Sequence, residues 1–233
     1  MAVTDDLAGI VTGVCERNAD AVHAVAAAIV ASGRADGLVR PAGAGHSLAA
    51  VLETFFRAGG LAHVRPLWHE RVLPFSGART ATAGEREPGL GRGVAEAAAI
   101  TAADTVVVFS TSGVNAYPVE IAQVARERGA TVVAVTSLAA SAAAPLRAGR
   151  RLHELAHHVL DTAVAPGDVS WPPAAPVTAP TSSLANVALW TAVLREVHAI
   201  DPDVPRWRSA NVAGGDEFNR GLEERFGPRV PEI

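Results

Sequence analysis

The sequence contains no lysine, and this absence excludes several kinds of chemistry at once. A Schiff base, a pyridoxal-phosphate attachment and the lysine of a Walker phosphate loop all need that side chain. Cysteine is nearly absent as well, because Cys15 is the one thiol in 233 residues. An internal disulfide is therefore ruled out, which fits a reducing cytoplasm. We interpret Cys15 as a small helix residue, since no catalytic context surrounds it.

Long apolar runs and basic blocks are also missing. No stretch of about 18 uninterrupted apolar residues occurs, and Asp5 and Asp6 stand where a signal peptide would be apolar. The net charge is −4. We therefore expect no membrane span and no signal peptide, and neither nucleic acid nor an anionic membrane as a main partner. With 49% hydrophobic residues, the chain is rich enough for a full core, and we predict one domain over residues 1–233.

The apolar residues that are present alternate between helical and strand patterns. Helical spacing predicts a long N-terminal helix over residues 4–32. Residues 105–109 are apolar on both faces, as in a buried parallel strand, and residues 130–135 are similar. Short links between helices and strands favour an α/β fold with a mostly parallel, doubly wound sheet. Further elements are a strand at 37–40, a helix at 48–57, a strand at 61–67, a glycine-rich loop at 72–92, a helix at 94–102, a proline-rich loop at 165–180, a helix from 181 to 200 and a polar tail at 202–233.

A turn rich in hydroxyl groups follows the strand at 105–109. It contains Ser110, Thr111, Ser112 and Asn115, and a helix begins near Pro118. The start of a helix offers free N–H groups and the positive end of its dipole, and small hydroxyl side chains there can donate to phosphate oxygens. The turn therefore indicates an anion site, with an ordinary capped strand–helix turn as the alternative interpretation.

Two further polar turns precede helices, at Gly43–Ser47 and at Thr181–Ser183. Together the three turns resemble those of the SIS (sugar isomerase) domain family. The resemblance extends from Gly43 to Asn219 and includes, besides the turns, Arg57-Ala-Gly-Gly-Leu61, Val135-Thr-Ser-Leu138, Pro166-Gly-Asp168 and Asn211-Val-Ala-Gly-Gly-Asp216. These pieces are most similar to a poorly characterised subgroup related to N-acetylmuramic acid 6-phosphate etherases and, more remotely, to phosphoheptose isomerases.

The resemblance implies a three-layer αβα sandwich around five parallel strands, with residues 157–161 entering the last strand. It also implies a cytoplasmic protein that binds a phosphorylated amino sugar and forms a homodimer or a larger homo-oligomer. Asn211 and Asp216 would reach the site of a partner subunit, with a plain surface tail as the alternative. The residues expected to hold the sugar phosphate are Gly45, Ser47, Ser110, Thr111, Ser112, Asn115, Thr181 and Ser182.

Three positions depart from the pattern of that subgroup. Val114 stands where many members carry arginine, which removes a cation near the ligand. The segment Ala143 to Arg151 is shortened and lacks a Ser-Arg-His run, so that Arg147 is the candidate replacement. Pro41 interrupts a strand that is usually continuous.

Sugar phosphates of this family react through the open-chain aldehyde, whose carbonyl acidifies the proton at C2. A carboxylate can remove that proton, and an acid can then protonate C1 or help a group leave C3. Glu85 and Glu53 are the candidate bases, and His46 is a candidate proton shuttle. Solvated charges for the two glutamates, and a helix cap for His46, are the alternatives. We predict a lyase that eliminates water or an ether group, with a phosphosugar isomerase or a non-catalytic sensor as alternatives, and neither a metal nor an organic cofactor is required.

Residues 153–157, His-Glu-Leu-Ala-His, match the H-E-x-x-H zinc signature. On a helix both histidines would share a face, but the chain offers no third ligand at a suitable spacing. The strand implied by the family resemblance conflicts with that helix, and we favour the strand. A dinucleotide-binding turn at Gly43 is disfavoured, because the third glycine is missing.

Overall fold

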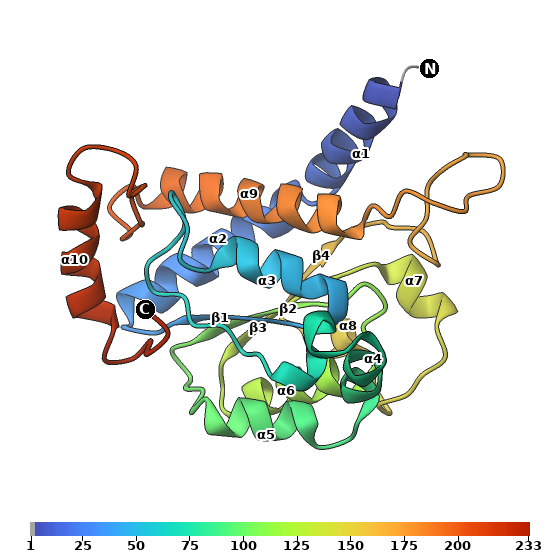
Figure 1. The fold of residues 1–233 in the computed structure, drawn as a ribbon, viewed down its shortest axis with the longest axis horizontal. Coiled ribbons are helices and arrows are strands. Elements are labelled where there is room, and N and C mark those ends of the chain that lie inside the picture. Colours follow the sequence, from blue (N-terminus) through green and yellow to red (C-terminus); the bar gives the residue numbers. More distant parts are fainter. Residues whose placement is uncertain (1–2) are drawn as a thin grey trace.

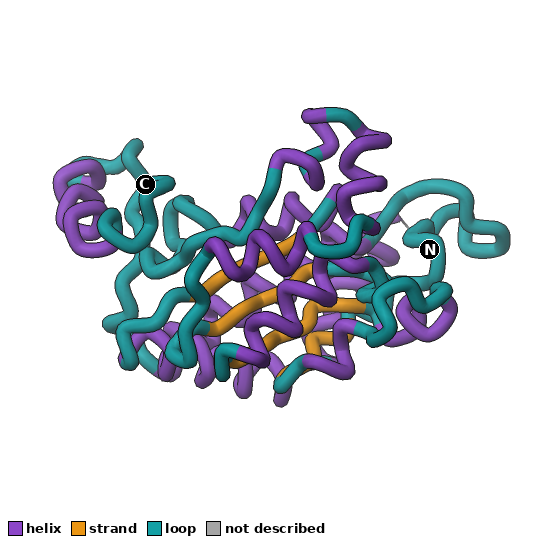
Figure 2. The backbone as a smooth tube through the Cα atoms, turned by 90° about the horizontal axis from the view of Figure 1, so that it is seen from below, coloured by secondary structure: helices purple, strands orange, loops and turns teal. Residues whose placement is uncertain are grey.

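The computed structural model describes residues 3–233 and contains one sheet of four parallel strands. The strands lie side by side in chain order, with helices on both faces (Figure 1, Figure 2). The three-layer α/β fold predicted from the sequence is therefore confirmed. The strands are β1 (Val39–Gly43), β2 (Thr105–Phe109), β3 (Thr131–Thr136) and β4 (His158–Asp161).

The two helical layers cover opposite faces of the sheet (Figure 1). One layer contains α2 (Ala19–Arg34), α3 (Leu48–Thr54) and α9 (Ser182–Ile200). The other contains α5 (Leu90–Ala97) and α6 (Ala116–Glu127), with α4 (Ala78–Arg86) beside them. All five residues of β2 are buried, as expected for a strand that is apolar on both faces and covered by both layers. The remaining helices are α1 (Val3–Arg17), α7 (Leu138–Ala143), α8 (Leu152–Leu155) and α10 (Gly215–Phe226).

The sheet has four regular strands, where five were expected. Residues 61–67 run parallel to the outer side of β1, but they form only isolated bridges with it. The N–H of Val39 donates to the carbonyl of His63 at 2.9 Å, and the N–H of Leu67 donates to Pro41 at 2.8 Å. Pro41 has no N–H to donate in return, so one rung of the ladder is missing. Contrary to expectation, β1 itself continues through Pro41.

The helix expected over residues 4–32 is divided into α1 and α2 at Asn18. The side-chain amide of Asn18 pairs with the backbone of β4, donating to the carbonyl of Asp161 at 2.9 Å and accepting from its N–H at 2.8 Å. Asn18 is 3% exposed. Its amide therefore supplies the outer edge of β4 with one pair of hydrogen bonds, and the chain changes direction to place it there.

The expected loop at residues 72–92 instead contains α4 and the start of α5. A helix had been expected only from Val94 to Ala102, whereas α5 ends at Ala97. Gly84 and Gly91 are the reason for the close packing here. A Cβ at Gly84 would lie 2.3 Å from the carbonyl oxygen of Arg71, and one at Gly91 would lie 2.3 Å from that of Tyr117.

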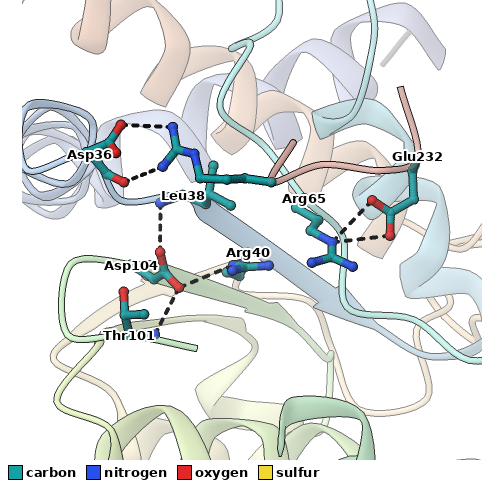
Figure 3. Close-up of polar contacts among 8 residues, drawn as sticks. Asp36, Leu38, Arg40, Arg65, Thr101, Asp104 and Glu232 are labelled. Atoms are coloured by element: carbon teal, nitrogen blue, oxygen red, sulfur yellow. Dashed lines mark hydrogen bonds and ion pairs between the residues drawn. The ribbon is translucent and has the colours of Figure 1, made fainter. Parts of the chain in front are cut away.

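The C-terminal tail packs on the body of the domain through α10. Phe226 and Val230 are buried, and two ion pairs flank them, Arg229 with Asp36 and Arg65 with Glu232 (Figure 3). Within residues 3–233, no helix is both long enough and apolar enough to cross a bilayer.

Beneath these ion pairs, Asp104 holds the start of β1 and β2 together (Figure 3). It accepts from the N–H of Leu38 at 2.8 Å, the N–H of Thr101 at 3.1 Å and Nε of Arg40 at 3.3 Å. Burial lowers the pKa of Arg40, and the charge of Asp104 opposes that shift.

Candidate functional site

The candidate site lies beside β1, at the point where successive connections leave the sheet order in opposite directions. From β1 the chain passes through α3 to residues 61–67 on one side, and then returns through α4 and α5 to β2 on the other side. In open α/β sheets, such a switch point opens a crevice at the carboxyl ends of the two strands. The turns after β1 and β2 meet there, so the topology itself brings two of the three polar turns together.

A cavity of about 530 Å³ occupies this crevice, a volume usual for small-molecule sites. The segments after β1, β2 and β4 line it, together with α4, α7 and the start of α9. The cavity thus gathers most of the residues that the sequence singled out: Gly45, His46, Ser47, Glu85, Ser110, Thr111, Ser112, Asn115 and Ser182.

The turn after β2 is held rigidly. Ser110 Oγ accepts from the N–H of Gly113 at 3.2 Å, and the carbonyl of Thr111 accepts from the N–H of Ser137 at 3.0 Å. Gly113 has φ +59°, and a Cβ there would lie 3.0 Å from Leu152, so glycine is required. The N–H groups of the first turn of α6 follow directly, without intrahelical acceptors. The turn therefore presents hydroxyl groups beside a helix N-terminus in a fixed geometry.

A chain of polar contacts crosses one wall of the cavity. Glu85, on α4, accepts from Asn115 Nδ2 at 2.8 Å, and Asn115 Oδ1 accepts from Nη1 of Arg147 at 3.1 Å. Arg147 is exposed, whereas Asn115 is 7% exposed. Arg147, the candidate replacement for the Ser-Arg-His run that the segment Ala143 to Arg151 lacks, thus contacts the site through Asn115.

Asp168 is the functional group that sequence reasoning missed. Its carboxylate lines the cavity and accepts the N–H groups of Thr181 and Ser182 at 3.0 and 2.9 Å, and Ser182 Oγ at 2.5 Å. The start of α9 is therefore capped by an acidic side chain from the preceding loop. The sequence indicated Pro166-Gly-Asp168 only through the family resemblance. A long loop separates Asp168 from α9, so the contact between them cannot be predicted from local sequence.

Four of the expected residues lie outside the cavity. Glu53 forms an ion pair with Arg57 on the surface of α3. Thr181 is buried at the start of α9 and does not line the cavity. Asn211 is exposed, and Asp216 lines a different cavity near Trp207.

The H-E-x-x-H stretch does not form one helix. α8 ends at Leu155, and β4 begins at His158, as the favoured strand interpretation predicted. His157 Nδ1 accepts from the N–H of Val132 at 2.9 Å, and burial lowers the pKa of His157. Among the described residues, no three His, Cys, Asp or Glu side chains converge as metal ligands.

Fold and cavity together define an α/β protein with a polar cavity at the carboxyl edge of its sheet. The family model described as SIS domain matches residues 4–137, and the chain belongs to the SIS domain family. It is 32% identical to the UPF0309 protein lin2794 of Listeria innocua over 232 residues, covering 95% of this chain and 93% of that protein. It is 35% identical to the UPF0309 protein BCAN_B0929 of Brucella canis over 234 residues, covering 98% and 96%.

Solved structures of the same fold include phosphoheptose isomerase GmhA from Neisseria gonorrhoeae. It superposes with a TM-score of 0.57 at 18% identity, covering 84% of this chain and 95% of that one. The sugar isomerase domain of an RpiR transcription factor from Sphaerobacter thermophilus gives 0.54 at 16% identity, covering 95% and 96%. At such identities the likeness establishes the fold alone.

Proposed function

We propose that the protein binds a phosphorylated amino sugar in this cavity and catalyses acid–base chemistry on it, as a phosphosugar lyase. The observation that carries the proposal is the convergence of the turns after β1 and β2 around one cavity with Glu85. Hydroxyl groups suited to a phosphate and a carboxylate suited to a proton then face the same ligand. Membership of the SIS domain family supports a sugar phosphate as that ligand.

The phosphate would lie against Ser47 and the turn from Ser110 to Ser112. Small hydroxyl groups and the N-terminus of α6 suit an anion. The chain has no lysine that could bind the phosphate elsewhere. Asn115 adds an amide that Arg147 polarises from outside. Ser182, whose hydroxyl already donates to Asp168, would contribute less than the sequence suggested.

Glu85 would act as the base. In the open-chain aldehyde, it takes the C2 proton, and the electron pair of that bond forms the C2–C3 double bond. The C3–O bond breaks, and the oxygen leaves as water after taking a proton from an acid. His46 lines the same cavity and is the proposed acid. The sugar loses one water in this step, and no electrons are gained or lost.

Isomerisation is the second candidate, because it shares the removal of the C2 proton and needs no leaving group. Glu85 would then return the proton at C1, and the proton of a C2 hydroxyl would pass to O1, so this route requires a sugar with a hydroxyl group at C2. The solved relative of this fold that is named a phosphoheptose isomerase supports this route, and the RpiR relative supports a third one, a sensor without turnover.

Incubation with N-acetylglucosamine 6-phosphate in deuterated water, followed by mass spectrometry, tests the proposal. Loss of water from N-acetylglucosamine 6-phosphate supports the lyase. Glucose 6-phosphate, which carries a hydroxyl at C2, tests isomerisation in parallel, and a shifted retention time with deuterium at C1 supports that route. Binding with neither product nor exchange would leave only the sensor. Glu85→Gln should reduce exchange at C2 by about 100-fold or more, as expected on losing a general base.

Glu53→Gln is the matched control for that variant. It makes the same chemical change on another helix, where the side chain pairs with Arg57 outside the cavity. Exchange at the normal rate in Glu53→Gln and lost exchange in Glu85→Gln would assign the base. The opposite result would place the base on α3 and overturn the assignment.

We also propose that the protein acts as a homodimer or a larger homo-oligomer in the cytoplasm. Several large apolar side chains near α3 support an association surface, since Leu52 is 70% exposed and Trp68 is 51% exposed. Light scattering of the purified protein tests the homo-oligomer. A measured mass of 23.9 kDa, that of one chain, would contradict it.

A further inference from the structure

Asp168 places a negative charge inside the proposed phosphosugar site. Its carboxylate lines the same cavity as Ser47 and Ser110, although the sequence had suggested that the start of α9 would hold phosphate. The N–H of Ser182 donates to Asp168 Oδ1 at 2.9 Å, and its hydroxyl donates to Oδ2 at 2.5 Å. The anion site at this helix is thus already occupied by the protein's own carboxylate.

The surrounding backbone holds this carboxylate in a defined position. Asp168 has φ +53° and follows Gly167 at φ +92°, so two successive residues are left-handed. That conformation is unfavourable for most residues other than glycine, although Asp tolerates it better than most. Three hydrogen bonds from the first residues of α9 then fix the side chain. A carboxylate held in this way cannot easily swing away from an incoming ligand.

The cavity therefore combines groups that suit an anion with groups that repel one. The turn after β2 offers hydroxyl groups and a helix N-terminus, whereas Asp168 and Glu85 contribute two carboxylates. Within the described part of the chain, neither carboxylate forms an ion pair with an arginine, since Asp168 binds α9 and Glu85 binds Asn115. A ligand with a second anionic group would bring like charges together in a site partly shielded from water.

We propose that Asp168 determines the ligand class: a sugar with one phosphate, whose other polar groups are hydroxyl, amide or amine groups and not a carboxylate. Asp168 Oδ2 retains a lone pair beyond its bond from Ser182, and it would accept a hydroxyl or amine hydrogen of the sugar. This inference rests on the proposed function, because it assumes a phosphosugar in the cavity. It separates the two eliminations, since an N-acetylmuramic acid ether carries a carboxylate and N-acetylglucosamine does not.

Calorimetric titration of three sugar phosphates tests the inference on the full chain. Glucosamine 6-phosphate and N-acetylglucosamine 6-phosphate should bind to the wild type, and N-acetylmuramic acid 6-phosphate should bind at least about tenfold more weakly. In Asp168→Asn the amide oxygen still accepts from α9 while the charge is removed, so that this difference should fall to about threefold or less. Asp203→Asn, an exposed position after α9, is the matched control and should keep the wild-type difference.

Equal binding of all three sugars to the wild type would overturn the inference, and so would an unchanged difference in Asp168→Asn. Comparing the three sugars on the wild type needs no variant, so this comparison tests the inference even if Asp168→Asn fails to fold. If none of the three sugars binds, the proposed function fails as well. Binding without discrimination removes only the role of Asp168, so the two failures are distinguishable.

Discussion

Acidification should destabilise the protein through His63, a buried side chain far from the candidate site. His63 lies beside β1, is 2% exposed and packs near Gly33 and the ring of Phe226, with ring centroids 6.4 Å apart. Its Nε2 has no hydrogen-bond partner among the described residues. Burial, followed by the charges of Arg229, Arg225 and Arg206, lowers the pKa of His63 from 6.5 to about 4. The folded protein therefore resists protonation here much more than the unfolded chain does.

The size of the effect follows from this difference in pKa. One pKa unit corresponds to about 1.4 kcal/mol, so His63 can remove up to about 3 kcal/mol of stability. The sign follows from proton uptake. Between the two pKa values only the unfolded chain binds the proton, so the free energy of unfolding falls as the pH drops below 6.5 and levels off near 4. Above pH 6.5 His63 contributes no pH dependence.

Urea denaturation at pH 7.5, 6 and 5 measures this loss. In the wild type, His63 should lower the free energy of unfolding by about 2 kcal/mol between pH 7.5 and pH 5. His63→Asn should lose that part of the decline, even if its stability at pH 7.5 is lower. His198→Asn, an exposed position on α9, is the control and should decline like the wild type. An equally steep decline in His63→Asn would refute the reasoning and assign the pH dependence to other groups.

Two further predictions concern buried contacts of the scaffold. Asp104→Ala leaves the buried guanidinium of Arg40 unpaired, so urea denaturation should show a loss of about 3–5 kcal/mol; a loss below 1 kcal/mol would contradict the importance of this pair. Gly91→Ala places a methyl group 2.3 Å from the carbonyl oxygen of Tyr117 and should cost about 1–3 kcal/mol, whereas Gly93→Ala on the same helix meets nothing within 4 Å and should be neutral or stabilising. Equal effects of the two glycine variants would disprove the packing argument.

The central part of the fold could be predicted from the sequence because its signals are local. Residues 105–109 are β-branched or aromatic at every position, and a polar turn and an amphipathic helix follow at once. That order fixes a strand, its carboxyl end and the helix start, and hence the place of Ser110 and Asn115. The meeting of this turn with Ser47 then follows from parallel strands, whose carboxyl ends share one edge of the sheet.

The elements that were missed depend on contacts between distant residues. Gly84 and Gly91 resemble loop residues in the sequence, yet they are helical, because each lets its helix approach a neighbouring backbone. The apolar periodicity continues on both sides of Asn18, so the break is invisible without β4. Asp168 binds Ser182 across a proline-rich loop, and no local sequence pattern predicts that hydrogen bond.

The pairing of Asn18 with β4 has a counterpart at the other side of the sheet. There the backbone of Gly59 to Ala62 bonds to residues 205–207, and Pro66 offers no N–H. A strand from a second molecule would therefore find few unpaired backbone N–H and C=O groups at either edge of the sheet. Concentrated solutions of the folded protein should accordingly resist growth of intermolecular β-structure, and fibres should form only under conditions that first detach Asn18 or residues 205–207.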